Sequence, residues 1–198
     1  MSRYSDHDDY VDPVTGVLRN LLGITESAQL ELVEAEIVAS RSFELSLVGV
    51  GDIFDAAKLK HIHLFPFRDL YEWAGRFRTV DISKGTNRFA HHAYLESAAM
   101  SIFIQLREEQ NLAGLDMEAF GSRAAYYLGE LNALHPFREG NGRTSREFLG
   151  LLARRNGFVF QWKMVNQTEM LQSVIDSFHG NLAGLTAILR RIVQVKPG

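Results

Sequence analysis

Twelve residues, HPFREGNGRTSR at positions 135 to 146, interrupt a helical pattern that lies on both sides of them. Before them, apolar residues recur at three- and four-residue steps from Met117 to Leu134, and a similar pattern follows them. Pro136 cannot continue the first helix, and the glycines around Asn141 are typical of a tight loop. The chain must therefore form a helix, a loop and a second helix here, with Arg143 at the start of the second helix.

Helical periodicity extends over most of the chain, and one stretch has a different pattern. We predict helices from residue 25 onward and over residues 52–63, 67–78, 94–109, 117–134, 143–156, 167–179 and 182–195. Between Arg78 and Ala90, Val80 and Ile82 alternate with polar neighbours, and the sequence KGTN is typical of a turn. This stretch predicts a short hairpin, so the fold class is mainly α with one β-hairpin.

The composition narrows the class of protein. With 198 residues, 46% of them hydrophobic, the chain fits one domain over residues 1–198. Its net charge of -3, from 21 basic and 24 acidic residues, predicts no direct nucleic-acid binding, so any polyanion site must be local. The absence of cysteine excludes disulfides and thiolate chemistry. The polar N-terminus and the lack of a long apolar run predict a cytoplasmic protein without membrane contact.

The loop and the helix start that follows it predict an anion site. The first N–H groups of a helix have no partner within it, and Gly140 and Gly142 would let a ligand approach them closely. Arg143 and Arg146 share one face of the first helical turn and can donate to phosphate oxygens. Glu139 would repel a bare phosphate, so we expect it to hold Mg²⁺ against a nucleotide with at least two phosphates.

Two further residues complete the predicted site. A histidine titrates near neutral pH, which suits His135 to accept a proton from an incoming hydroxyl. Phe137, which lies between polar neighbours, is expected to point into the core and hold the loop. Each feature is common by itself, and it is their fixed spacing that predicts transfer of a phosphorus-centred group from a Mg-nucleotide to an alcohol.

The twelve residues match every specified position of HxFx[DE]GNGRxxR, so the chain resembles the Fic (filamentation induced by cAMP) family. The upstream segment LKHIHLFPFRDLYEWAGRFRTVDISKG is similar to the family segment that leads into its β-hairpin, called the flap. The resemblance covers about residues 10 to 190 and leaves a short N-terminal arm. It implies the Fic fold, a helical bundle with a short β-hairpin flap over the active site.

The resemblance also implies a role for each residue of the motif. His135 would deprotonate a Tyr, Ser or Thr hydroxyl of a target protein, and Glu139 would bind Mg²⁺ between the α- and β-phosphates of ATP. The remaining phosphate contacts would come from Asn141 and the amides of Gly140 and Gly142 at the α-phosphate, Arg143 at the β-phosphate and Arg146 at the γ-phosphate.

The flap would bind the target by strand addition and place its hydroxyl in line with the α-phosphorus. The flap residues implied here are Lys84, Gly85, Thr86 and Phe89. The implied reaction is AMP transfer from ATP by a protein adenylyltransferase. Members of the Doc branch transfer the γ-phosphate and have a lysine where this chain has Gly142, so AMP transfer is favoured. A Doc-like protein kinase and a catalytically silent nucleotide-binding interaction module stay open as alternatives.

Fic enzymes of this kind are commonly inhibited by a helix with the sequence [ST]xxxE[GN], whose glutamate pairs with the second arginine, here Arg146. Ser27–Glu31 and Ser40–Glu44 have the spacing, but leucine follows each, and we expect ordinary helix positions. The resemblance therefore implies a stand-alone bacterial toxin inhibited by a small antitoxin that carries this helix. Toxins of that group modify the ATPase subunits of DNA gyrase and of topoisomerase IV, the latter called ParE, and these become the expected targets.

Other histidines give weaker signals. His61 and His63 are two residues apart in a predicted helix, and His91 and His92 are adjacent, so neither pair has metal-ligand spacing by itself. We expect them in helix packing or at the surface. The segment from 156 to 162, with the helix after the motif, is expected to contribute to the nucleoside pocket.

Overall fold

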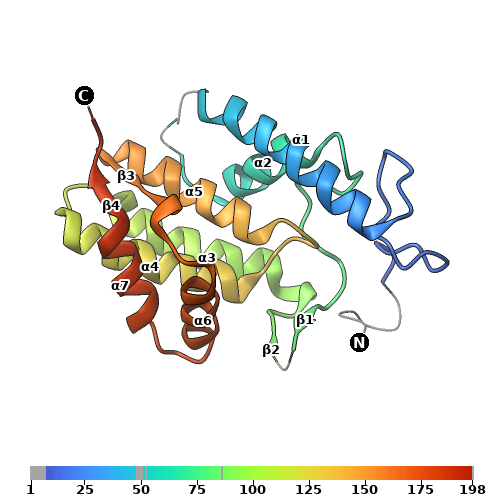
Figure 1. The fold of residues 1–198 in the computed structure, drawn as a ribbon. Coiled ribbons are helices and arrows are strands. Elements are labelled where there is room, and N and C mark those ends of the chain that lie inside the picture. The colour runs from blue at the N-terminus through green and yellow to red at the C-terminus, as the bar shows by residue number, and fades with distance from the viewer. Residues whose placement is uncertain (1–7, 48–50, 52, 86, 198) are drawn as a thin grey trace.

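The structure is a computed structural model that describes residues 8–47, 51, 53–85 and 87–197. Within these residues the chain is mainly helical, as the sequence predicts (Figure 1). The helices are α1 (Ser27–Leu47), α2 (Ala56–Phe67), α3 (Leu95–Glu108), α4 (Met117–Leu134), α5 (Asn141–Arg155), α6 (Gln167–Phe178) and α7 (Ala183–Ile192). The strands are β1 (Ser83–Lys84), β2 (Asn87–Arg88), β3 (Phe158–Phe160) and β4 (Val193–Val195).

Helix α4 lies at the centre of the bundle (Figure 1). It packs against α3, α5, α6 and α7, while α1 packs on α2 and α2 also contacts α5. Asp116 begins α4, because its side chain accepts a hydrogen bond from the N–H of Ala119 at 2.8 Å. The buried residues of α4 recur at helical spacing, among them Phe120, Ala124 and Leu131. Because α4 and α5 pack together, the loop between them is fixed at both ends.

The predicted hairpin is present and projects from the helical body (Figure 1). Strands β1 and β2 are antiparallel, with Ser83 opposite Arg88 and Lys84 opposite Asn87. This flap joins the turns that follow α2 to the start of α3. Thr86, which we predicted to contact the target, lies outside the described residues.

The predicted bounds of α2 were wrong at both ends. The helix starts at residue 56 and not 52, because Asp55 is its N-cap and accepts a hydrogen bond from the N–H of Lys58 at 2.8 Å. At the other end α2 includes Pro66, which we expected to interrupt it. Proline lacks an N–H, yet the last turn still closes, because the N–H of Arg68 donates to the carbonyl of Leu64 at 2.9 Å.

The helix predicted over residues 67–78 is not formed. The chain makes successive tight turns there, in which N–H groups donate to carbonyls three or four residues earlier. Gly75 has φ 74°, a left-handed conformation that a continuing right-handed helix does not contain. Leu70, Tyr71 and Trp73 are nevertheless buried, as expected for the apolar side of this segment. The apolar spacing therefore identified core residues but not their backbone conformation.

A second small sheet was missed. The helix predicted over residues 182–195 ends at Ile192, and the next three residues form β4, which pairs antiparallel with β3 and places Phe160 opposite Val193. The prediction of one hairpin was therefore incomplete. The pairing joins segments more than thirty residues apart, and β-branched residues such as Val193 suit either role until that partner is known.

The N-terminal arm is attached to the motif loop by a buried ion pair. The Asp8 carboxylate contacts the Arg138 guanidinium at 2.6 and 2.9 Å, and both side chains are almost completely buried. Further along the arm, Val11 and Leu18 form an isolated antiparallel bridge. Among the described residues, no helix is long and apolar enough to cross a membrane.

Candidate active site

His135 occupies the end of α4 in a conformation that few residues adopt there. Its backbone is left-handed, with φ 45° and ψ 59°, and its N–H closes the last turn of α4 by donating to Leu131 at 3.0 Å. The ring nitrogen Nδ1 lies 3.3 Å from the carbonyl oxygen of Asn132. A carbonyl can only accept, so Nδ1 carries the proton and Nε2 keeps its lone pair. The helix end therefore presents an imidazole that can accept a proton at Nε2.

Burial controls the protonation of this imidazole. The His135 ring stacks on Phe89 of the flap, with ring centres 3.8 Å apart and an angle of 14° between the planes. Burial lowers the pKa of His135 to about 4, and the positive charges of Arg78 and Lys84 add to this effect, while the hydrogen bond to Asn132 opposes it. His135 is thus neutral at pH 7, the state that a general base requires.

The loop after His135 is built around two side chains that the motif supplies. Phe137 is fully buried, as predicted. Asn141 is buried too, and its side-chain amide accepts from the N–H of Phe137 at 2.8 Å and donates to its carbonyl at 2.7 Å. In this structure the Asn141 side chain therefore holds the loop closed, whereas a contact with the α-phosphate remains a prediction.

His63 supports the loop from below, which the sequence did not reveal. It is fully buried in α2, between the rings of Phe67 and Phe137, with ring centres 4.6 and 3.9 Å away. Its Nδ1 accepts from the N–H of Gly75 at 2.9 Å, and its Nε2 donates to the carbonyl of Glu139 at 3.0 Å. Burial lowers the pKa of His63 to about 4, so the ring is neutral. His61, by contrast, is exposed, as expected.

The two glycines of the motif have different surroundings. Gly140 has φ 79°, and a Cβ atom built on it would lie 2.4 Å from the Phe67 ring. Gly142, in the first turn of α5, is exposed, and a Cβ atom there would meet nothing within 4 Å. The protein's own packing therefore requires glycine at Gly140 but not at Gly142, where the open space lies beside the unpaired N–H groups of a helix start.

Arg143 and Arg146 lie beside this space on the first turns of α5. Arg143 forms an ion pair with Glu34 of α1, and its guanidinium lies 3.9 Å from Glu139. The Glu34 carboxylate is buried and also accepts a hydrogen bond from the hydroxyl of Tyr71. Burial and Glu34 raise the pKa of Tyr71, so it stays a donor. Sequence reasoning missed Glu34, because nothing in the sequence links α1 to the motif.

The predicted inhibitory positions do not contact Arg146. Glu31 is exposed on α1, and Glu44 pairs with Arg41 at 2.9 Å. Within the described residues, Arg146 forms no ion pair, and its Nε donates to the carbonyl of Gly142 at 3.1 Å. Both glutamates thus occupy ordinary positions on α1, as we expected.

A cavity of about 430 Å³ lies next to the two arginines. Its walls come from α1, α2, α5 and the segment from Val159 to Trp162, with Phe67, Phe160 and Trp162 as aromatic lining. This volume is within the range of small-molecule sites, and the mixed polar and apolar walls suit a nucleoside. The segment predicted to contribute to a nucleoside pocket therefore borders a cavity of suitable size.

Glu139 and the flap complete the predicted set. The Glu139 side chain is partly exposed, and one of its oxygens accepts from the N–H of Gly140 at 2.9 Å. One carboxylate next to a phosphate site fits Mg²⁺, which is commonly bound by one or two carboxylates together with substrate phosphates. On the flap, Lys84 and Gly85 are exposed, with Gly85 at φ 63°, and Phe89 lies over His135.

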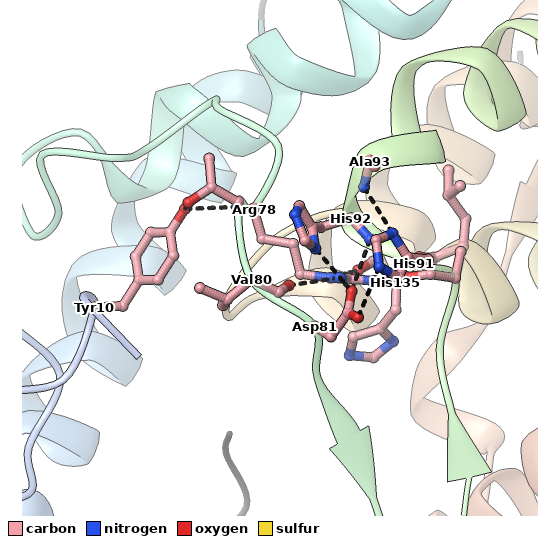
Figure 2. Close-up of polar contacts among 11 residues, drawn as sticks. Tyr10, Arg78, Val80, Asp81, His91, His92, Ala93 and His135 are labelled. Carbon is pink, nitrogen blue, oxygen red and sulfur yellow. Dashed lines mark hydrogen bonds and ion pairs between the residues drawn. The ribbon is translucent and has the colours of Figure 1, made fainter. Parts of the chain in front are cut away.

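Asp81 lies between His91 and His92 at the base of the flap (Figure 2). One ligand atom from each lies within 4.8 Å of the others. Hydrogen bonds already use these groups: Asp81 accepts from the backbone N–H of His92 at 2.8 Å and contacts its Nδ1 at 3.0 Å. Nδ1 of His91 accepts from the N–H of Ala93 at 3.2 Å, which directs an Nε2 proton toward Asp81, 3.3 Å away. Both histidines are exposed, as expected.

The fold and the site together define a mainly helical protein that places a histidine base beside an anion-binding helix start and a flap. The family model described as Fic/DOC family matches residues 53–153. The chain belongs to the Fic/DOC family.

Relatives extend the likeness over nearly the whole chain. Protein adenylyltransferase VbhT of Bartonella schoenbuchensis is 50% identical over 192 residues, which are 96% of this chain and 40% of VbhT. Probable protein adenylyltransferase y4lH of Sinorhizobium fredii is 38% identical over 195 residues, 98% of this chain and 100% of that protein. This chain thus spans less than half of VbhT and the full length of y4lH.

A solved structure agrees with the fold. The N-terminal Fic domain of a putative cell filamentation protein from Bartonella quintana, with bound ADP, has a TM-score of 0.89 and 25% identity. The match covers 95% of this chain and 95% of that one. The Fic fold that the sequence predicted is thereby confirmed.

Proposed function

We propose that this protein is a protein adenylyltransferase that transfers AMP from ATP to a Tyr, Ser or Thr hydroxyl of a target protein. The observation that carries the proposal is the neutral imidazole of His135, with Nε2 free of its proton, at the loop that leads into the open helix start at Gly142. Two relatives that align over almost the whole chain are named as protein adenylyltransferases, one of them as probable, and a Fic domain of similar fold was solved with ADP.

The reaction follows from the positions of these groups. The target hydroxyl oxygen attacks the α-phosphorus of ATP, and its proton passes to Nε2 of His135. A new bond forms between oxygen and phosphorus, the bond from the α-phosphorus to the bridging oxygen breaks, and pyrophosphate leaves. The N–H groups at the start of α5, with Arg143 and Arg146, offset the negative charge of the phosphates.

Glu139 is the residue that would hold Mg²⁺. When bound, the metal would offset charge on the departing pyrophosphate. Arg143 is already paired with Glu34 in this structure, so ATP must share that guanidinium with a buried carboxylate. The cavity beside Arg146 is where the adenosine would lie.

The alternatives are a Doc-like protein kinase and a silent binding module. The presence of Gly142, rather than a lysine, favours attack at the α-phosphorus over a reversed nucleotide. The imidazole held ready to accept a proton favours catalysis over simple binding.

The biological setting that we propose is a cytoplasmic bacterial toxin controlled by a separate antitoxin. Its support is the family resemblance together with Arg146, which has no ion pair among the described residues and so could accept the glutamate of an external [ST]xxxE[GN] helix. The expected targets are the ATPase subunits of DNA gyrase and of topoisomerase IV, the latter being ParE.

Labelled ATP tests the reaction. Bacterial lysate, purified protein and Mg²⁺ are incubated with ATP labelled at the α- or the γ-phosphate, and His135→Ala is the control. We expect label on protein from the α-position only, and none with the variant. Label from the γ-position alone would establish the kinase instead, and no label from either would favour the binding module.

A further inference from the structure

Arg78 is a buried arginine that contacts carbonyl oxygens at three places around the site. Its side chain is almost completely buried and follows the turns that connect α2 to the flap. Nε donates to the carbonyl of His135 at 2.9 Å, Nη1 to Val80 at 2.7 Å and Nη2 to Ala90 at 2.5 Å. The backbone N–H of Arg78 also donates to Pro136 at 2.8 Å.

These acceptors belong to the two parts that must meet in the reaction. Val80 precedes β1 and Ala90 follows β2, so one guanidinium holds both ends of the flap (Figure 2). The carbonyl of His135 lies at the C-terminal end of α4, where free carbonyls favour a cation. Arg78 therefore connects the flap to the backbone of the general base.

The electrostatic environment of Arg78 is unusual for a residue that only supports the fold. Its nearest carboxylate is Asp81, at 3.8 Å, and that side chain is also engaged by His91 and His92. Burial lowers the pKa of Arg78. A buried cation paired mainly with neutral carbonyls is costly, and an apolar side chain could fill such a place with less desolvation. What an apolar side chain cannot do is fix the separation of several carbonyl groups with one rigid planar fork.

We propose that Arg78 is a positioning residue that sets the distance and angle between the flap and the imidazole of His135. The proposal rests on the proposed function, because the flap is taken to hold the target hydroxyl. Phe89, directly before Ala90, stacks on the His135 ring, so a displacement of the flap at Ala90 moves the ring's only stacking partner from the flap among the described residues. Arg78 itself contacts neither the cavity nor the start of α5.

Arg78→Lys is the test variant, because it keeps the charge and the size but replaces the planar fork by a single ammonium group. The matched control is Arg76→Lys, the same substitution at an exposed arginine two residues earlier. For each protein, we would measure the rate of label transfer from α-labelled ATP at saturating ATP, the dissociation constant for ADP, the thermal midpoint, and the NMR signals of the His135 imidazole.

We expect Arg78→Lys to lower the saturated rate by about 10- to 100-fold, since a displacement near 1 Å can cost about 100-fold in rate. The dissociation constant for ADP should change less than about twofold, which is under 0.5 kcal/mol. The His135 signals should shift, and Arg76→Lys should match the wild type in every measurement.

An unchanged rate for Arg78→Lys overturns the proposal, and so does a loss of rate that is matched by an equal loss of ADP affinity, because both exclude a selective effect on the base. If the wild type transfers no AMP, the proposed function fails, and the NMR comparison still decides the role of Arg78. Shifted His135 signals with unchanged ADP affinity then support the positioning role, and unchanged His135 signals refute it.

Discussion

The two glycines of the motif allow the packing of the protein and the space for its ligand to be separated by experiment. Gly140→Ala places a methyl group 2.4 and 2.6 Å from atoms of the buried Phe67 ring, at a φ of 79°. The left-handed conformation costs about 1–2 kcal/mol for a residue with a Cβ. Overpacking of a rigid core adds about 1–3 kcal/mol. Gly140→Ala should therefore destabilise the protein by about 2–5 kcal/mol.

Gly142→Ala should have the opposite effect on stability. A Cβ atom at Gly142 meets nothing within 4 Å, and alanine is favoured over glycine in a helix by up to about 1 kcal/mol. Stability should thus be unchanged or slightly raised. If the open space belongs to a phosphate group, however, the methyl group blocks its approach to the N–H groups of α5. We expect nucleotide affinity to fall by about tenfold or more, equivalent to about 1.4 kcal/mol.

Urea unfolding measures the first effect, and calorimetric titration with ADP measures the second. Wild-type affinity in Gly142→Ala would contradict the assignment of this space to a ligand. Wild-type stability in Gly140→Ala would show that the contact with Phe67 relaxes freely and that the steric argument is wrong.

Two further predictions concern the histidines. The pKa of His63 is about 4 in the folded protein and near 6.5 when unfolded, so the unfolded state binds the proton first as the pH falls. Stability should therefore be lost between pH 6.5 and 4, by up to about 3 kcal/mol from His63, and urea unfolding of wild type and His63→Asn should show a shallower pH dependence for the variant. Phe89→Ala should expose His135 and raise its pKa from about 4 toward 6.5, moving the acidic limb of the pH–rate profile upward. An acidic limb that stays in place would show that Phe89 does not determine the burial of His135.

Much of the site was predictable because it lies within twelve consecutive residues. Pro136 and the glycine-rich loop fix the helix, loop and helix start locally, and the motif residues keep these relative positions in the structure. The helices α4 and α6 were also predicted closely, since their periodicity is strong and Asp116 and Asn166 cap them.

The missed features depend on contacts between distant segments. Glu34 is more than a hundred residues from Arg143, and Arg78 is more than fifty from His135, so no local pattern reveals either contact. The pairing of β3 with β4 has the same origin. The turns after α2 show a different limit, because buried aromatic residues occur at helical spacing in a segment that His63 and Gly75 hold in turns.

The central claim is that His135 takes a proton from a protein hydroxyl while AMP is transferred to it. The most direct measurement is tandem mass spectrometry of proteins from bacterial lysate treated with ATP, Mg²⁺ and either the wild type or His135→Ala. The account predicts adenosine monophosphate on the side-chain oxygen of a Tyr, Ser or Thr residue with the wild type only. Phosphate on that oxygen, or the same adduct with His135→Ala, would contradict it.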